Sequence, residues 1–217
     1  MPSFLSVFKL QKMKNNPTIF IIDDDKAVRR SLSLFLHSVG YAVETFESAE
    51  EYLEAEKFEG AGCIILDVNM GGKSGLELQE ELIQKDSDLP IIFITGKGNI
   101  QMSVNAVKKG AVNFLEKPFT EEEILLSVSE AVSLSQNMVF QKAEKQTAQN
   151  LINSLTPREL EILKYLPTGM LNKQIAGELK IAVQTVKIHR RSICDKLGVK
   201  SVPEILRIAE HAGFKML

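Results

Sequence analysis

The first part of the chain alternates between short apolar runs and longer stretches with helical periodicity. Between the first two runs, apolar residues from Val28 to Val39 recur at i, i+4, i+7, i+8 and i+11, which is the spacing of one helix face. This alternation predicts a doubly wound α/β fold, in which a five-stranded parallel sheet carries helices on both faces. The predicted strands are Thr18–Ile22, Tyr41–Thr45, Cys63–Leu66, Pro90–Thr95 and Ala111–Leu115.

Several helices of this region carry a start signal in the sequence. A Ser or Thr followed three residues later by Glu has the spacing of a capping box, in which the two residues satisfy backbone amides of the first helical turn reciprocally. Such pairs are Ser48–Glu51, Ser74–Glu77 and Thr120–Glu123. They predict helices after the second, third and fifth strands.

The strand–helix alternation ends after Lys117-Pro118, and only helical patterns follow. Residues 121 to about 150 predict one helix that grades into a polar connector, so residues 135–149 are expected to form a partly helical linker. The chain is therefore predicted to hold one domain over residues 18–134 and an all-α, four-helix domain over residues 150–214. Breaks between the helices of the second domain are expected at Gly169, Lys180, Gly198 and Pro203. Residues 1–12 precede this pattern and are set aside.

Charge divides the chain in the same way. Residues 153–217 carry 11 Lys and Arg against 6 Asp and Glu, whereas the preceding residues carry 15 against 22. The basic second domain has the sign needed to meet the phosphates of a nucleic acid. Cys63 and Cys194 lack metal-ligand spacing and are expected to be reduced thiols, as in a cytoplasmic protein. No apolar run approaches the length of a membrane span, so no membrane partner is expected.

Polar residues interrupt the predicted strands at their carboxyl ends. Asp23, Asp24 and Asp25 end the first strand, Asp67 the third and Thr95 the fourth, and Lys117 follows the fifth. These ends converge on one crevice in a doubly wound sheet. Carboxylates gathered there would repel one another without a cation, and hard oxygen ligands suit Mg²⁺, which would screen a phosphoryl group approaching Asp67. Thr95 and Lys117 are suited to hold the other phosphoryl oxygens.

Each of these features alone has an ordinary structural explanation. An Asp run after a strand is usually a helix cap with solvated neighbours, and a single Asp at a strand end is often a turn former. Lys117-Pro118 alone would be a loop, in which the bond to Pro118 is a candidate for the cis form. Their joint placement at several strand ends is what favours a functional site.

Four motifs carry a resemblance to a known family: IFIIDDD, IILDVNM with Gly75 beyond it, IIFITG and AVNFLEKPF. Through them, residues 18–134 resemble the receiver domain of a bacterial response regulator, a flavodoxin-like fold. The resemblance implies that Asp67 is the phosphoacceptor and that Thr95 and Lys117 act beside it. It also implies that Mg²⁺ is held by Asp24, Asp67 and the backbone carbonyl of Asn69, with Asp23 acting through water.

The resemblance further implies that Thr95 and Phe114 form a switch pair, in which the hydroxyl moves onto the phosphoryl group and the ring turns inward. An aromatic residue of the core is the alternative interpretation of Phe114. One departure is visible, because the family usually has Pro directly after the Met70 position and this chain has Gly71-Gly72. The departure loosens the loop and concerns the rate of phosphorylation or dephosphorylation rather than its site.

The stretch Val183–Leu197 predicts a helix with two unlike faces. Val186, Ile193 and Leu197 form an apolar stripe, and Lys187, Ile188 and Arg191 lie opposite, with Gln184 one turn earlier. On a helix in the major groove of DNA, Ile188 could touch a thymine methyl while the two cations reach bases or phosphates. A basic solvated helix with one exposed Ile is the alternative.

Four further segments, SLTPREL, GMLNKQIAGEL, TVKIHRRSICDKLGV and EILRIA, resemble the LuxR-type helix-turn-helix module over residues 150–214. With the receiver, the architecture resembles the NarL/FixJ family, and FixJ-like members in particular. The resemblance implies that the last helix, from about Val202 to Ala212, is a dimer contact. It assigns base contacts to Lys187, Ile188 and Arg191 and phosphate contacts to Lys173, Thr185 and Lys196. Arg190 is equally compatible with a phosphate contact or an internal ion pair, and His189 is expected to be a packed structural residue.

Taken together, the resemblance implies a two-component response regulator that accepts a phosphoryl group on Asp67 and then binds promoter DNA. Its partners would be a sensor histidine kinase, RNA polymerase and a second copy of the chain after phosphorylation. Its only chemistry would be Mg²⁺-dependent self-phosphorylation and dephosphorylation of the receiver.

Two alternatives belong to other classes. A phosphohydrolase places its Asp nucleophile after the first strand with a second Asp two residues on, whereas here the third strand is used and Asn69 follows. A receiver that is never phosphorylated, and serves for dimerisation or ligand sensing, would typically have lost one of the pocket residues. Those residues, all present here, are Asp23, Asp24, Asp67, Thr95 and Lys117.

Overall fold

The structure is a computed structural model that describes residues 16–56, 58–96, 106 and 108–217. The chain divides between Val139 and Phe140 into two compact units. Within the described residues, none of the helices has both the length and the apolar character needed to cross a membrane. Cys63 and Cys194 are both free thiols.

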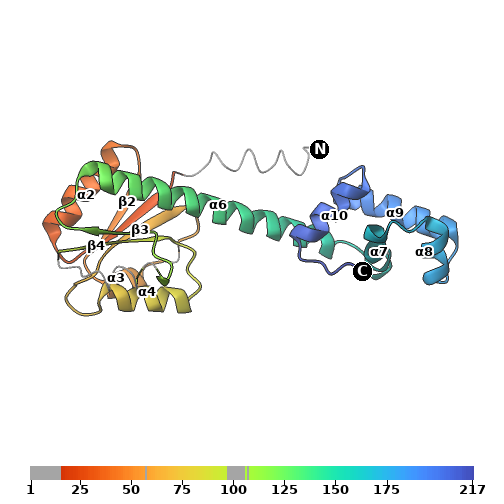
Figure 1. The fold of residues 1–217 in the computed structure, drawn as a ribbon, viewed down its shortest axis with the longest axis horizontal. Coiled ribbons are helices and arrows are strands. Elements are labelled where there is room, and N and C mark those ends of the chain that lie inside the picture. The colour runs from red at the N-terminus through yellow and green to blue at the C-terminus, as the bar shows by residue number, and fades with distance from the viewer. Residues whose placement is uncertain (1–15, 57, 97–105, 107) are drawn as a thin grey trace. The chain divides into compact units, whose positions relative to one another are not determined.

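The apolar runs of the first unit form one parallel sheet, as predicted (Figure 1). Its order is β2-β1-β3-β4-β5. The central strands β1, β3 and β4 are buried along their whole length, because helices cover both faces of a parallel sheet. The bounds of the strands are β1 Thr18–Ile22, β2 Ala42–Phe46, β3 Gly62–Asp67, β4 Ile91–Thr95 and β5 Asn113–Glu116.

Among the described residues, two helices cover each face of this sheet. The helices are α2 Lys26–Ser38, α3 Ala49–Glu54, α4 Gly75–Gln84 and α6 Glu121–Asn153. The α2 and α6 helices lie on one face, and α3 and α4 lie on the other (Figure 1). On the first face Leu36 and Val128 pack in one core with Ile65, and on the second Leu78 packs in another core with Phe93. The apolar face of each helix therefore packs against the sheet, and the strand ends remain available to form a site.

The expected helix starts are confirmed at two positions and only half formed at the third. Ser74 and Glu77 cap each other reciprocally, and so do Thr120 and Glu123. Ser48 caps its helix alone: its hydroxyl accepts from the backbone N–H of Glu51 at 3.2 Å. The carboxylate of Glu51 accepts instead from the N–H of Glu47, one residue earlier, at 2.7 Å.

The α6 helix extends through the whole expected linker, residues 135–149. The run contains neither Gly nor Pro, so nothing in it interrupts the backbone hydrogen bonds. Apolar residues are buried near both ends: Val128 lies in the core of the first unit, and Ala148 and Ile152 lie in the core of the second. A partly helical connector was expected from a polar composition that is rich in Gln, Lys and Ala and has no Gly or Pro. Polar side chains on the exposed side of a helix do not end it, and the helix is continuous.

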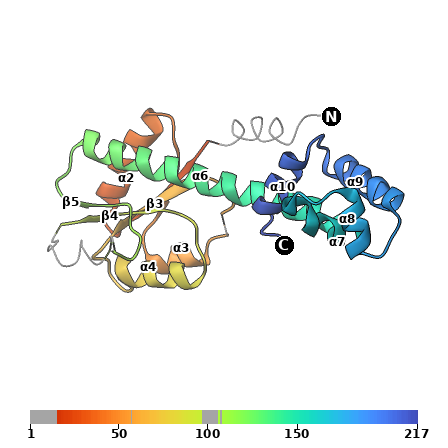
Figure 2. The same ribbon diagram turned by 45° about the vertical axis from the view of Figure 1, so that its right-hand side comes forward.

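The second unit packs short helices around one core (Figure 2). Its elements after α6 are α7 Pro157–Tyr165, η1 Leu166–Thr168, α8 Asn172–Glu178, α9 Val183–Leu197 and α10 Val202–His211. Three of the expected breaks are confirmed, because Gly169, Lys180 and Gly198 have positive φ angles of 71°, 51° and 67°. The fourth is wrong: Pro203 lies inside the first turn of α10, where a missing N–H costs no helical hydrogen bond.

Candidate functional site

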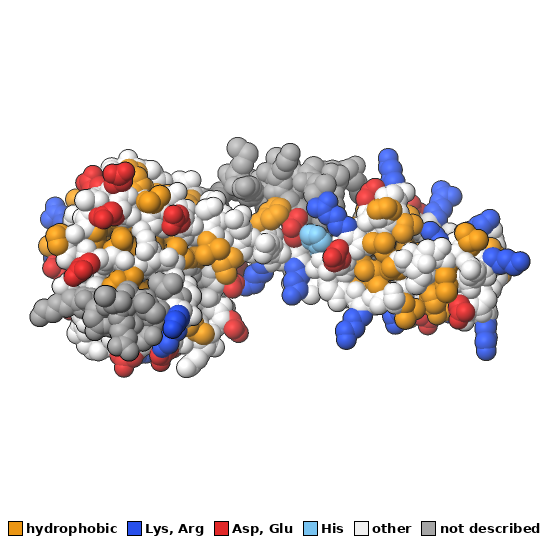
Figure 3. All heavy atoms as spheres, viewed as in Figure 1, with side chains coloured by type: hydrophobic (Ala, Val, Ile, Leu, Met, Phe, Trp, Pro, Cys, Tyr) orange, Lys and Arg blue, Asp and Glu red, His pale blue; other side chains and the backbone are white. Residues whose placement is uncertain are grey.

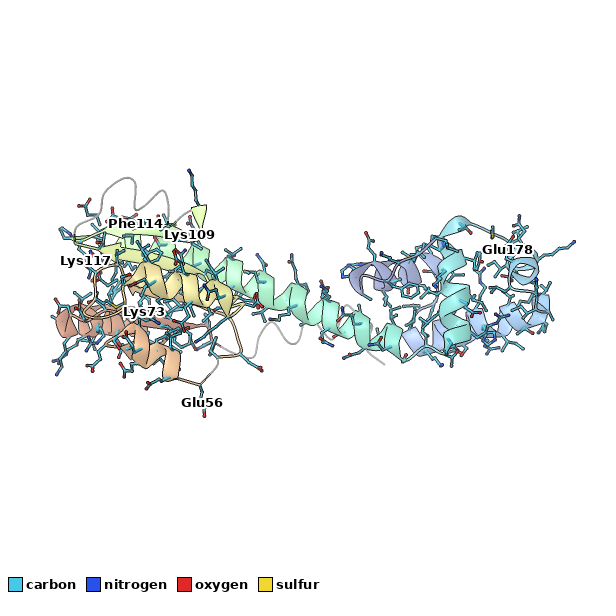
Figure 4. The ribbon with its side chains drawn as sticks, turned by 90° about the horizontal axis from the view of Figure 1, so that it is seen from below. Glu56, Lys73, Lys109, Phe114, Lys117 and Glu178 are labelled. Carbon is cyan, nitrogen blue, oxygen red and sulfur yellow. The ribbon has the colours of Figure 1, made fainter. Side chains whose placement is uncertain are left out.

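The ends of β1 and β3 and the loop after β5 bring three charged residues together. The ammonium Nζ of Lys117 lies 2.6 Å from Asp23 Oδ2 and 2.9 Å from Asp67 Oδ1. Asp23 is fully buried and Asp67 nearly so. Lys117, labelled in Figure 4, directly precedes Pro118, and the peptide bond between these two residues is cis. One cation thus bridges two carboxylates that are 44 residues apart in sequence and would otherwise repel each other.

Burial and pairing act in opposite directions on these groups. Burial raises the pKa of Asp67, and the adjacent Lys117 ammonium opposes that rise only in part. Burial alone would lower the pKa of Lys117, but hydrogen bonds to Asp23 and Asp67 outweigh it and raise the pKa. Lys117 is therefore held in its charged form beside Asp67, where it can also pair with an incoming anion.

Asn69 connects Asp67 to Thr95. Its backbone N–H donates to Asp67 Oδ2 at 2.9 Å, and its side-chain amide donates to Thr95 Oγ1 at 3.0 Å. Thr95 is fully buried at the end of β4. Phe114 is half-buried on the neighbouring strand β5, with its ring centroid 6.2 Å from that of Phe93. The ring of Phe114 is thus neither enclosed in the core nor free in solvent.

Asp24 does not join the other carboxylates. Its side chain is exposed, and Asp24 Oδ2 accepts a hydrogen bond of 3.1 Å from the backbone N–H of Gly71. Among the residues that the structure describes, no three acidic, His or Cys side chains are grouped closely enough to hold a metal ion. Of the carboxylates expected to surround Mg²⁺, Asp23 and Asp67 meet at the ammonium of Lys117, whereas Asp24 lies apart from them.

The loop that follows Asp67 requires glycine at one position. A Cβ atom on Gly75 would lie 2.2 Å from the carbonyl oxygen of Asp67 and 3.0 Å from Leu66, a clash that only glycine avoids. The N–H of Gly75 donates to the Val68 carbonyl at 3.1 Å. This close approach starts α4 immediately beside the strand end that carries Asp67.

Arg29 supports the pocket, a role that was not predicted from the sequence. The guanidinium of Arg29 donates a hydrogen bond to the backbone carbonyl of Asp23 and lies 3.8 Å from Glu47. It therefore fixes the turn between β1 and α2. A basic residue one turn into a helix has no distinctive sequence signal, so this role could be found only from the structure.

In the second unit, α9 has the two faces that its sequence predicts. Val186, Ile193 and Leu197 are buried, whereas Lys187 and Arg191 are exposed. Ile188, between these cations, is 59% exposed. Lys and Arg side chains project from this unit on the face shown in Figure 3. A well-formed helix thus presents cations around a solvent-exposed apolar side chain.

The residues expected near phosphates have different environments. Lys173 is exposed in the first turn of α8, and Thr185 is half-buried in the first turn of α9. Lys196 instead forms an ion pair with Glu159 on α7, with 2.7 Å between Nζ and Oε2. Of the residues with open roles, Arg190 donates to Asn172 Oδ1 at 2.9 Å, which is neither an ion pair nor a phosphate contact. His189 is half-buried.

Glu159 joins α7 to α9 and was not identified from the sequence. Its nearly buried carboxylate accepts from Ser192 Oγ at 2.6 Å as well as from Lys196. Burial alone would raise the pKa of Glu159, but these bonds and those from Thr156 outweigh burial and lower the pKa to about 2. Thr156 and Glu159 have capping-box spacing, so the helix start could have been predicted, but the partners on α9 could not.

The last helix hides its apolar residues inside its own unit. Ile205, Ile208 and Ala209 of α10 are buried in the core of the second unit. Its exposed positions are Pro203, Glu204, Arg207 and Glu210. A dimer contact through α10 would therefore use three charged side chains and the ring of Pro203.

Comparison with known families and proteins agrees with both halves of this description. Residues 19–129 match the response regulator receiver domain, and residues 153–209 match the bacterial regulatory proteins of the luxR family. The chain is 42% identical to the transcriptional regulatory protein TdiR of Thauera aromatica, over 90% of this chain and 86% of that protein. It is 35% identical to the transcriptional regulatory protein FixJ of Bradyrhizobium diazoefficiens, over 90% of this chain and 95% of that protein.

Solved structures give the same result. The response regulator StyR has a TM-score of 0.85 and 42% identity, over 90% of this chain and 99% of that one. Full-length FixJ from B. japonicum has a TM-score of 0.56 and 34% identity, over 92% of this chain and 98% of that one. The chain is therefore a two-component response regulator. It belongs to the NarL/FixJ family, with a receiver domain and a LuxR-type DNA-binding domain, and its relatives are transcriptional regulators.

Proposed function

We propose that Asp67 is the phosphoacceptor and that a sensor histidine kinase supplies its phosphoryl group. The observation that supports this most directly is the ammonium of Lys117 at 2.9 Å from Asp67 Oδ1, at the carboxyl end of a central strand. An anion added to Asp67 would meet that ammonium and, on the other side, the hydroxyl of Thr95. Both groups are already linked to Asp67, one directly and one through Asn69.

The donor groups of this pocket fit a divalent cation. Asp23 and Asp67 already flank the ammonium of Lys117, and carboxylate and carbonyl oxygens are the ligands that Mg²⁺ prefers. Asp23, Asp24, Asp67 and the backbone carbonyl of Asn69 would hold it. When bound, Mg²⁺ would offset the negative charge of the carboxylates and of the phosphoryl oxygens. Lys117 then orients the phosphoryl group, and Thr95 and Phe114 report its presence to the receiver surface.

The DNA-binding domain reads its promoter through α9. Lys187, Ile188 and Arg191 face the bases, and Lys173 and Thr185 lie near phosphates. Lys196 is left out of this set, because its ammonium is already paired with Glu159. Phosphorylated receivers pair, which brings two α9 helices to a two-fold site in the cytoplasm, where RNA polymerase is recruited.

The test is incubation of the full chain with a small phosphodonor and Mg²⁺, scored by intact mass. Wild type should gain one phosphoryl group and Asp67→Asn none, because Asn lacks the nucleophilic carboxylate. The same reaction in excess chelator should give no labelling. Equal labelling of Asp67→Asn, or full labelling in chelator, would contradict the proposal.

A further inference from the structure

The loop after Asp67 makes a contact that bears on how the receiver holds its cation. Gly71 lies at the position where the sequence departs from the receiver pattern, and its backbone N–H donates to Asp24 Oδ2 at 3.1 Å. A proline at this position would have no N–H to donate. The bond joins residues 47 apart in sequence, one after β1 and one after β3.

The rest of the loop holds this N–H in place. The backbone N–H of Lys73 donates to Glu50 Oε1 on α3 at 3.1 Å, and the Lys73 ammonium pairs with Glu81 on α4. Gly72, between Gly71 and Lys73, has a φ of +96°, a backbone conformation that favours glycine. Figure 4 labels Lys73 on this loop. The amide of Gly71 is therefore presented to Asp24 by a loop that is tied to two helices.

The consequence is a separation of the acidic residues. Asp23 and Asp67 meet at Lys117, whereas an oxygen of Asp24 is engaged at the loop and its side chain faces solvent. This explains why the described residues contain no ready group of three metal-ligating side chains, although the sequence supplies the carboxylates.

We propose that the bond from Gly71 N to Asp24 Oδ2, the Gly71 latch, withholds Asp24 from the divalent cation of the receiver. Cation binding that draws Asp24 in toward Asp23 and Asp67 breaks this bond, so Gly71 is a positioning residue that weakens the affinity for Mg²⁺ in the unphosphorylated protein. The inference rests on the proposed function, since it assumes that Mg²⁺ is bound at Asp23, Asp24 and Asp67.

Two substitutions at one position separate the N–H from the side chain. Gly71→Pro removes the donor, whereas Gly71→Ala keeps it. The added Cβ would meet Asp24 Oδ2 at 3.9 Å, an ordinary contact, and Gly71 is not among the residues with a positive φ. Titration calorimetry of the full chain with MgCl₂ should give a dissociation constant about 2- to 10-fold lower for the Pro variant than for the Ala variant. Equal constants would overturn the latch. A weaker Pro variant would also overturn it, because the bond would then orient Asp24 for the metal.

Two further measurements keep the test decisive if the Pro variant is poorly folded. In wild type, the latch predicts that hydrogen exchange of the Gly71 amide becomes faster when Mg²⁺ saturates the receiver, and an unchanged rate would overturn it. In an Asp24→Ala background, Gly71→Pro and Gly71→Ala should bind Mg²⁺ equally, and a persisting difference would overturn it. Absence of Mg²⁺ binding by wild type and by both Gly71 variants would overturn the proposed metal site itself, and the latch with it.

Discussion

Lys187, Ile188 and Arg191 share one exposed side of α9 but would recognise DNA by different physics. A cation that reaches a base edge discriminates between sequences, whereas one that touches a phosphate strengthens binding to every sequence. An apolar side chain that is 59% exposed between two cations contributes little to stability, since most of its surface stays in contact with water. Ile188 is therefore the residue whose role DNA binding would explain most directly.

Lys187→Ala should weaken binding to the preferred site by about 1–3 kcal/mol and reduce the discrimination against variant sites, if Lys187 reads a base. Lys164→Ala is the matched control, because it removes one exposed cation from α7 and leaves α9 intact. Affinities for the preferred site and for single-base variants, measured at one salt concentration, separate the two roles. A uniform loss on all sequences would assign Lys187 to the phosphate backbone.

The buried pocket was predictable from sequence in a way that the surface partners were not. Asp23 and Lys117 are 94 residues apart, yet both were expected at one crevice because parallel strands end at the same edge of a sheet. The apolar runs likewise predict every strand to within two residues. No such rule brings Lys196 to Glu159, or Asp24 to Gly71. Those pairs depend on how separate elements pack, so a phosphate contact was predicted for Lys196 and a metal-ligand role for Asp24.

At the scale of elements, Glu159 holds α7 to α9, the helix that we propose reads DNA. Replacing it by Gln would leave the Lys196 ammonium without its counterion and weaken the bond from Ser192. We expect Glu159→Gln to lower the free energy of unfolding of residues 140–217 by about 1–3 kcal/mol at pH 7. Glu161→Gln on the same helix is the control, because Glu161 is half exposed in an i, i+3 pair, and it should change stability by less than about 0.5 kcal/mol.

The same contact gives a pH dependence with a definite sign. The pKa of Glu159 is lowered to about 2 in the folded protein, below its ordinary value of 4.5. Its contribution is therefore complete above about pH 4.5 and is lost as the pH falls toward 2. The difference in unfolding free energy between wild type and Glu159→Gln should shrink over that window, as followed by denaturant titrations at several pH values. A difference that is independent of pH would show that the carboxylate charge is not responsible.

The start of α8 is incompletely capped and offers a stabilising substitution. Leu171 is the N-cap residue and is 70% exposed, and its side chain makes no capping hydrogen bond. Gln174 already provides the return half, since its Oε1 accepts from the Leu171 N–H at 2.7 Å. Leu171→Ser should complete a capping box and raise stability by about 0.5–1.5 kcal/mol, measured as a higher thermal midpoint. Leu171→Ala adds no acceptor, so an equal gain from Ala would contradict the explanation.

At the scale of the whole molecule, the receiver and the DNA-binding domain share α6, which is helical from Glu121 to Asn153. The helix belongs to both units, because Val128 lies in the core of one and Ala148 in the core of the other. This fixes where the chain can be divided. A fragment that begins near residue 150 would lose Ala148 from its core, so an isolated DNA-binding domain should begin at Phe140.

Phosphorylation should act on DNA binding through pairing of chains rather than through charge. A phosphoryl group would add about two negative charges at Asp67, in the unit that does not carry α9. On the proposed function it would instead bias a two-state receiver surface through Thr95 and Phe114, and two paired receivers would bring two α9 helices to half-sites about one DNA turn apart. Each chain then adds its own phosphate contacts, so the affinity for a two-fold site should rise steeply on phosphorylation.

The measurement compares phosphorylated and unphosphorylated full-length protein with residues 140–217 alone. Full-length protein should bind a two-fold site more tightly after phosphorylation and shift from monomer to dimer over the same range of labelling. The fragment should bind without that control, and a single half-site should show little of the increase, since pairing then brings no second set of contacts. If both forms of the full chain had the same affinity and the same monomer–dimer balance, Thr95 and Phe114 would not transmit the state of Asp67 to α9.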